Sequence, residues 1–161
     1  MKIRLMTLAC CLVFVFAALP ALAEQVEAES FSIQVPEGWH VVSSPDSKVV
    51  AIILKDKGFA MTLHVAPTGG KKAADMARQG SKGQGGTPPK KITGMKADAY
   101  AYTWTAPQGE KAETRLYVNK RKILTLNIVG DPGPHSDEAE GILATLVSSD
   151  PAIDEILEEL K

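Results

Sequence analysis

The chain has 161 residues, of which 45% are hydrophobic, and it carries 18 basic and 19 acidic side chains for a formal net charge of −1. A chain of this length is typical of a single domain with its own hydrophobic core. The charge balance argues against the class of nucleic-acid-binding proteins, which need a dominant basic surface.

The first 23 residues have the pattern of an export signal. Lys2 and Arg4 give a positive start, residues 5–19 form an almost unbroken apolar run, and Ala21-Leu22-Ala23 supplies the small residues that signal peptidase recognises. We therefore expect cleavage after Ala23 and a periplasmic or secreted mature protein. The apolar run is shorter than the roughly 20 residues that cross a bilayer, and no later segment competes with it, so we expect no membrane span.

Cleavage would also remove both cysteines of the chain, Cys10 and Cys11. Because the signal holds two basic residues and no acidic one, the mature chain would keep 16 basic and 19 acidic residues and a net charge of −3. Without a thiol it can form no disulfide, no thiolate metal site and no cysteine nucleophile. We expect an ordinary packed core to provide its stability.

The exported part begins with residues 24–30, whose polar composition predicts a flexible lead-in. The stretch FSIQVPEGW at 31–39 then alternates apolar and polar residues, as in a strand with one buried face, before a Pro-Glu-Gly turn. Residues 49–55, VVAIILK, are β-branched and apolar, as in a strand covered on both faces, and 59–66 alternate again. These two segments predict a hairpin.

Between the hairpin and the later strands the alternation is lost. An Ala-rich stretch at 71–79 predicts two helical turns, and the segment GSKGQGGTPPK that follows predicts a mobile surface loop. Three further strands are predicted at 97–106, 114–118 and 122–130.

Two helices are predicted to close the chain. One begins near Ser136 or Asp137 and presents apolar residues at helical spacing. The other starts at Asp150, with Pro151 in its first turn. Runs of strands followed by helices predict an α+β fold with an antiparallel sheet flanked by helices.

Several of these segments together resemble the PsbP-like superfamily. They are FSIQVPEGW, the central helix with its loop, the aromatic strand, the YVNKRKILTLNIVG hairpin and the closing ILATLVSS helix. That superfamily includes the extrinsic photosystem II protein, a Ran-binding nuclear import factor and the DcrB-like envelope proteins of bacteria. The resemblance covers residues 31–148 as a single domain and leaves 149–161 as a C-terminal amphipathic helix. It implies an α/β/α sandwich that binds other macromolecules, and it brings no catalytic residues.

Two apolar features are candidate binding sites. Tyr100, Tyr102 and Trp104 share one face of a predicted strand, where they either pack beneath a helix or form an exposed platform for a peptide, glycan or apolar ligand. The last helix carries an apolar stripe that either packs on its own domain or docks into a groove of a partner. The residues of that stripe are Ile153, Ile156, Leu157 and Leu160.

Basic residues are the third feature, because Lys90-Lys91 and Lys120-Arg121-Lys122 lie next to predicted turns. Such residues keep hairpin tips soluble, and the alternative is a contact with an anionic membrane or an acidic partner.

Motifs for catalysis, metal binding and nucleotide binding are missing from the sequence. His40, His64 and His135 are the only imidazoles and lack the usual ligand spacing, and no serine lies in a nucleophile elbow. We therefore predict no catalytic residue, no metal site and no cofactor. The expected function is that of an exported, non-catalytic binding or accessory protein of the bacterial cell envelope, with an envelope protein as partner. The alternatives are a small-ligand carrier with an aromatic-lined pocket and, last, a hydrolase built on His64 or His135.

Overall fold

The computed structural model describes residues 23–44, 46, 48–54, 58–158 and 160. The predicted export signal, except for Ala23, lies outside these residues. No helix in the described part of the chain is both long enough and apolar enough to cross a membrane.

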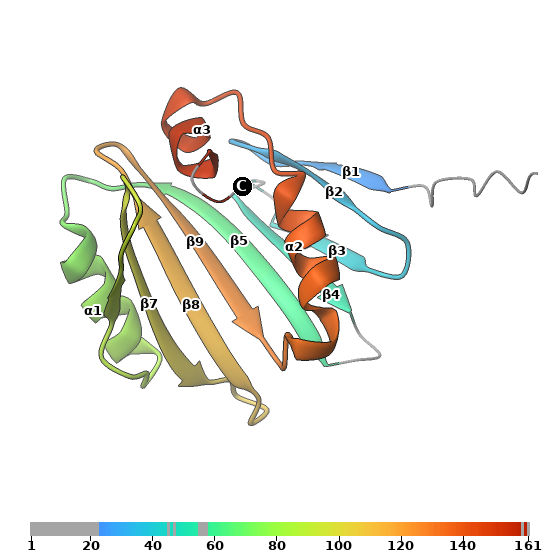
Figure 1. The fold of residues 1–161 in the computed structure, drawn as a ribbon, viewed down its shortest axis with the longest axis horizontal. Helices are drawn as coiled ribbons and strands as arrows, with labels where there is room; N and C mark the ends of the chain where they lie inside the picture. Colours follow the sequence, from blue (N-terminus) through green and yellow to red (C-terminus); the bar gives the residue numbers. More distant parts are fainter. Residues whose placement is uncertain (1–22, 45, 47, 55–57, 159, 161) are drawn as a thin grey trace, which may run out of the picture.

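An antiparallel sheet of seven strands, in the order β3-β4-β5-β9-β8-β7-β6, dominates the described residues (Figure 1). The strands are β3 (His40–Ser43), β4 (Val49–Leu54), β5 (Phe59–Pro67), β6 (Lys90–Ile92), β7 (Asp98–Thr105), β8 (Lys111–Val118) and β9 (Lys122–Val129). The predicted hairpin and the three later strands are thus confirmed, and all of them belong to one sheet.

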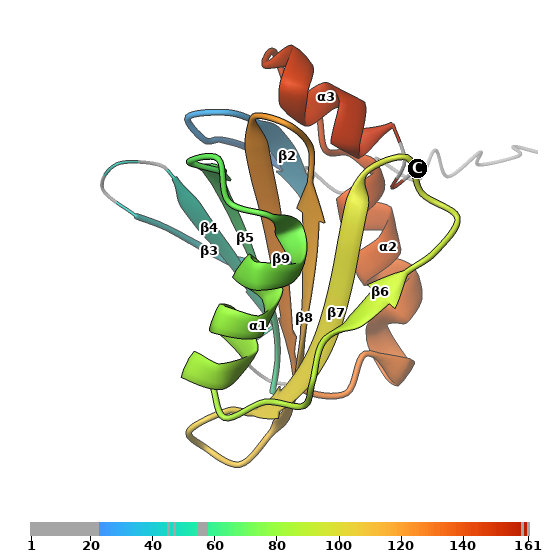
Figure 2. The same cartoon turned by 90° about the vertical axis from the view of Figure 1, so that its left-hand side faces the viewer.

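Helices cover both faces of this sheet, which confirms the predicted α+β sandwich (Figure 2). Helix α1 (Ala73–Gly83) packs on one face, against β7 and β8. On the other face lie α2 (Ser136–Ala144), α3 (Pro151–Leu157) and a small two-stranded sheet of β1 (Glu24–Glu27) and β2 (Ser32–Val35). A short 3-10 turn, η2 (Gly133–His135), leads into α2.

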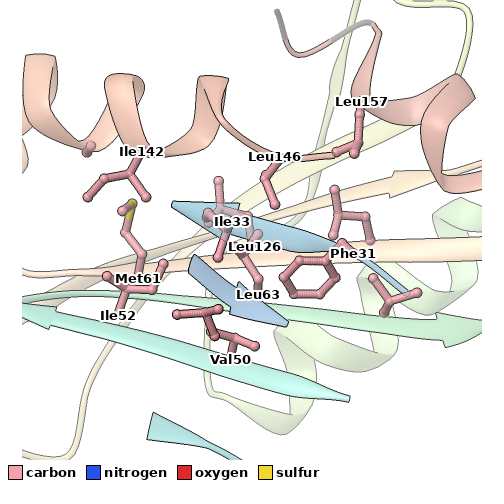
Figure 3. Close-up of a cluster of buried hydrophobic side chains, with 14 of the residues drawn as sticks. Phe31, Ile33, Val50, Ile52, Met61, Leu63, Leu126, Ile142, Leu146 and Leu157 are labelled. Atoms are coloured by element: carbon pink, nitrogen blue, oxygen red, sulfur yellow. The ribbon is translucent and has the colours of Figure 1, made fainter. Parts of the chain in front are cut away.

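The main core lies between the sheet and the layer formed by β2, α2 and α3 (Figure 3). Because residues alternate between faces along a strand, Ile52, Met61 and Leu126 project from neighbouring strands into one apolar layer. Ile33 of β2 and Ile142 of α2 meet them from above, and all five side chains are at most 2% exposed. The alternation predicted for 31–39 therefore places a strand of the smaller sheet over the larger one.

The flexible lead-in expected at residues 24–30 is wrong. Residues 24–27 form β1, which pairs antiparallel with β2 from Glu24 opposite Val35 to Glu27 opposite Ser32. Val26 is the one buried side chain of β1. A strand held by the backbone of its neighbour needs few apolar residues of its own, so its polar composition did not reveal it.

The two-sided cover expected for residues 49–55 is also wrong within the described part of that segment. Val50 and Ile52 are fully buried, but Ala51 and Ile53, on the opposite face, are partly exposed. The reason lies in the position of α1, which covers the opposite end of that face, near β7 and β8.

The mobile loop predicted after residue 79 is ordered in the structure. Helix α1 continues to Gly83, and the Ser81 hydroxyl is buried and donates to the Thr87 carbonyl oxygen at 2.6 Å. The Thr87 amide donates to the Thr103 carbonyl oxygen of β7 at 2.8 Å. The segment thus follows the edge of β7 rather than leaving the domain.

Candidate functional site

Strand β7 places Tyr100, Tyr102 and Trp104 on one face, as predicted, but they do not form a common exposed platform. Tyr102 is 5% exposed beneath α1, and its hydroxyl donates to Gln84 Oε1 at 2.7 Å. Trp104 Nε1 donates to the hydroxyl of buried Thr114 at 3.0 Å. Tyr100 and Trp104 are half-buried and line two different clefts.

The apolar stripe of α3 belongs to the core of its own domain. Ile153, Ile156 and Leu157 are at most 1% exposed, and Leu160 packs against the same cluster from a half-buried position. The Asp150 carboxylate caps α3 by accepting from the Ala152 amide at 2.9 Å. A partner could reach the stripe only after α3 had detached, so the docking interpretation of these four residues does not hold.

A cationic cleft opens at the end of the sheet where the segment before α1, the β6–β7 loop, the β8–β9 turn and the start of α3 meet (Figure 2). Its volume is about 800 Å³. Its basic residues are Lys71, Lys72, Lys96, Lys120 and Arg121, its acidic residues are Asp98 and Glu155, and Tyr100, Val118 and Pro151 form uncharged parts of its wall. We call this hollow the cationic cleft below.

The cations of the cleft outnumber its nearby acids. Asp98 is already paired with Lys91 at 3.0 Å, and the hydrogen bond from that carboxylate raises the pKa of Lys91. Within the described part of the chain, no ion pair joins a carboxylate to Lys71, Lys72, Lys120 or Arg121, and all four are exposed. The cleft therefore carries a local excess of positive charge that attracts anions.

Backbone hydrogen bonds fix two of the cation-bearing segments relative to each other through Thr68, which is 6% exposed. The Thr68 amide donates to the Arg121 carbonyl oxygen at 3.0 Å, and its hydroxyl donates to the Lys120 carbonyl oxygen at 3.4 Å. The Lys71 amide in turn donates to the Thr68 carbonyl oxygen at 3.1 Å. The position of the backbone that bears these lysines is therefore set before any ligand arrives.

Asn119 holds the β8–β9 turn against α3. Its Oδ1 accepts from the amides of Arg121 and Lys122 at 2.9 and 2.8 Å, while its Nδ2 donates to the Ala152 carbonyl oxygen. Lys122 adds an ion pair with Asp150 at 3.2 Å. The pKa of Asp150 is lowered, first by the Ala152 amide and then by Lys122. Lys122 thus secures α3, and the two preceding basic residues remain available to the cleft.

A second cleft, of about 1200 Å³, runs past Trp104 at the opposite end of β7. Gly85 and Gly86 form one side, and Ala112 and Ile128 add apolar surface. This hollow is the counterpart of the aromatic-lined pocket that the sequence left as an alternative.

The three imidazoles are not brought together. His64 lies on β5 between Leu63 and Val65, whose side chains enter the core, so its own side chain projects to the opposite face. The ring of His135 packs against Phe59, with 5.9 Å between centroids, on the core side. Among the described residues, no group of three His, Cys, Asp or Glu side chains could hold a metal ion.

The cationic cleft was only partly visible in the sequence. The turn at 120–122 was recognised as basic, but Lys71, Lys72 and Lys96 lie far from it along the chain. Only the pairing of β5 with β9 and of β8 with β7 brings these segments to one end of the sheet. The available signal was a repeated one, because in each case basic residues lie at or beside a turn.

No protein-family model matches the sequence, and no curated protein matches it. Two solved structures are similar in fold. One is the solution structure of cyanobacterial PsbP (CyanoP) from Synechocystis sp. PCC 6803, with a TM-score of 0.53 and 8% identity over 82% of this chain and 95% of that one. The other is a crystal structure from Bacteroides thetaiotaomicron, with a TM-score of 0.46 and 15% identity over 75% of this chain and 46% of that one. The architecture described above, together with the match to CyanoP, shows that this chain has a PsbP-like fold.

Proposed function

We propose that this protein is an exported, non-catalytic binding or accessory protein of the bacterial cell envelope and that it acts through protein–protein contacts. The observation that carries the proposal is the cationic cleft, in which four exposed basic residues without a printed ion pair surround an open hollow. A rigid recess with a local charge excess is suited to recognition, because its charges need no rearrangement when a partner binds. The export pattern of residues 1–23 supports a location outside the cytoplasm.

Site-specific photo-crosslinking in living cells tests this function. A photoreactive amino acid replaces Ala74, which lines the cationic cleft, and in a second strain it replaces Gln108. Gln108 is an exposed residue of the β7–β8 turn, at the opposite end of the hairpin. We expect one defined envelope protein to be crosslinked from position 74 and not from position 108. Fractionation of the same cells should find the processed chain in the envelope.

The absence of a crosslinked protein at position 74, or an unprocessed chain in the cytoplasm, would contradict the proposal.

The cleft beside Trp104 supports a second candidate, a carrier of a small apolar ligand. Trp104 is half-buried there, so its fluorescence would report occupancy. In a Trp39→Phe background, which leaves Trp104 as the single indole outside the export signal, the uncharged probe N-phenyl-1-naphthylamine should quench that emission. Unchanged emission up to saturating probe would remove the carrier function.

A further inference from the structure

We propose that the cationic cleft binds an acidic, extended peptide segment of the partner protein. This inference rests on the proposed function and specifies the chemistry of the partner at the same site. Its basis is the charge, shape and wall composition of the hollow bounded by Lys71, Lys120 and Arg121.

Charge is the first argument. The chain as a whole is close to neutral, with a formal net charge of −1, yet five basic residues line this single hollow. Of its two acidic residues, Asp98 is paired with Lys91, and Glu155 lies 3.4 Å from the side-chain amide of Asn119. Like charges held close together repel each other, and an anionic ligand would relieve that repulsion. Several carboxylates in a row match several cations around one cleft.

Shape distinguishes a peptide from a bilayer. The cationic cleft is concave, and at about 800 Å³ it lies within the range of pockets that enclose most of a ligand. A flat membrane would contact only its rim and leave the recessed wall unused. An extended chain can enter the hollow and place successive side chains on opposite walls.

The wall composition adds a further requirement. Tyr100, Val118 and Pro151 give the cleft uncharged surface between the basic residues. Tyr100 is half-buried and presents both an aromatic ring and a phenol to the hollow. A simple polyphosphate would leave this surface uncovered, whereas a peptide with an apolar residue among its acids would cover it. We therefore expect the bound segment to mix Asp or Glu with one apolar side chain.

The fixed backbone strengthens the argument. The β8–β9 turn is tied to Thr68 and to α3, so Lys120 and Arg121 project from a backbone that is already ordered. Binding would then cost only the ordering of long side chains and of the peptide.

The test measures binding of a short fluorescein-labelled peptide, in which Asp and Glu flank a Leu-Tyr pair, by fluorescence anisotropy. The protein is expressed at full length and purified as the host processes it. The charge-removing variant is Lys120→Gln with Arg121→Gln, and the matched control is Lys82→Gln with Lys111→Gln, which removes two exposed cations outside the cationic cleft. Thermal unfolding of both variants establishes that they fold.

We expect the cleft variant to bind the peptide roughly tenfold more weakly and the control less than about twofold more weakly. Affinity should fall as salt rises, since exposed charges are screened. The same peptide with Asn and Gln in place of its acids should not bind. Replacing Leu-Tyr by Gly-Ser should weaken binding, and Tyr100→Ser should remove that difference.

Inorganic tripolyphosphate and vesicles containing phosphatidylglycerol are measured in parallel. If either binds with the same dependence on Lys120 and Arg121 while the peptide does not, the acidic-peptide proposal is overturned. Equal weakening in the cleft and control variants would overturn it as well, because it would indicate non-specific attraction. The crosslink at Ala74 separates this failure from failure of the function: a captured envelope protein without peptide binding rejects only the acidic segment.

Discussion

At the scale of single residues, two glycines allow the segment after α1 to lie directly on β7. A Cβ added at Gly80 would lie 2.7 Å from the Tyr102 hydroxyl, and one added at Gly86 would lie 2.8 Å from the Thr103 carbonyl oxygen. The contact at Gly86 is to backbone and cannot be relieved by a rotamer change. These glycines provide close approach between segments, whereas the sequence pattern had suggested flexibility.

The substitution Gly86→Ala should therefore destabilise the domain. The added methyl group would also meet Tyr102 Cδ2 at 3.2 Å and Trp104 Cβ at 3.3 Å, so either the loop or β7 must move. Overpacking of this kind costs about 1–3 kcal/mol of unfolding free energy. Urea denaturation followed by circular dichroism measures the change.

Gly141→Ala is the matched control, because Gly141 lies within α2, is exposed and has nothing within 4 Å of its added Cβ. Alanine in place of glycine inside a helix stabilises it by about 0.5–1 kcal/mol. Equal unfolding free energies for the two variants would show that Gly86 is not closely packed.

At the scale of elements, the parts predicted best are those whose own side chains determine their burial. The alternation in 59–66 specified β5, and the helical spacing of Ile153, Ile156 and Leu157 specified the apolar face of α3. Local pattern could not tell that α3 packs on its own domain, because the complementary surface is formed by distant strands. The same limit applies to β1, which is held by the backbone of β2.

The cationic cleft was out of reach for the same reason. A turn such as 119–121 can be recognised from its residues, and Asn119 does organise it by accepting from two backbone amides. Which other lysines lie near it depends on strand order, and strand order is a property of the whole sheet. The sequence therefore indicated separate basic turns without showing that they converge.

Removal of α3 should loosen the domain rather than leave it intact. A chain ending at Ser149 would expose the core surface that Ile153, Ile156 and Leu157 now cover, and it would lose the ion pair between Lys122 and Asp150. Hydrogen exchange should then become faster in β9, against which α3 packs, as well as in its neighbours.

If the shortened chain does not fold, Ile156→Ala in the complete chain carries the same prediction, with an expected loss of about 2–5 kcal/mol. Exposed Glu155 provides the control, since Glu155→Ala removes no buried surface. Unchanged exchange in β9 after removal of α3 would contradict the assignment of this helix to the core.

At the scale of the whole molecule, the sheet separates two apolar layers, and each layer contains a buried phenol. Tyr102 lies in the layer beneath α1, and Tyr117 lies in the main core on the other face. Burial raises the pKa of both phenols, because removal from water disfavours the charged phenolate. For Tyr117, nearby Arg115 opposes part of this effect.

Raised phenol pKa values link both layers to alkaline unfolding. Below about pH 10 these tyrosines are neutral in the folded and the unfolded chain, so their linkage leaves stability unchanged. As pH rises past that value, the unfolded chain loses the protons first and gains free energy from ionisation, so stability falls until the folded-state pKa values are passed. The double variant Tyr102→Phe with Tyr117→Phe lacks both phenols. Its urea midpoint, measured from about pH 8 to about pH 11 and set relative to its own value at about pH 8, should fall less steeply than that of the natural chain. Parallel curves for the two proteins would contradict the prediction, because they would assign the alkaline loss to groups outside these layers.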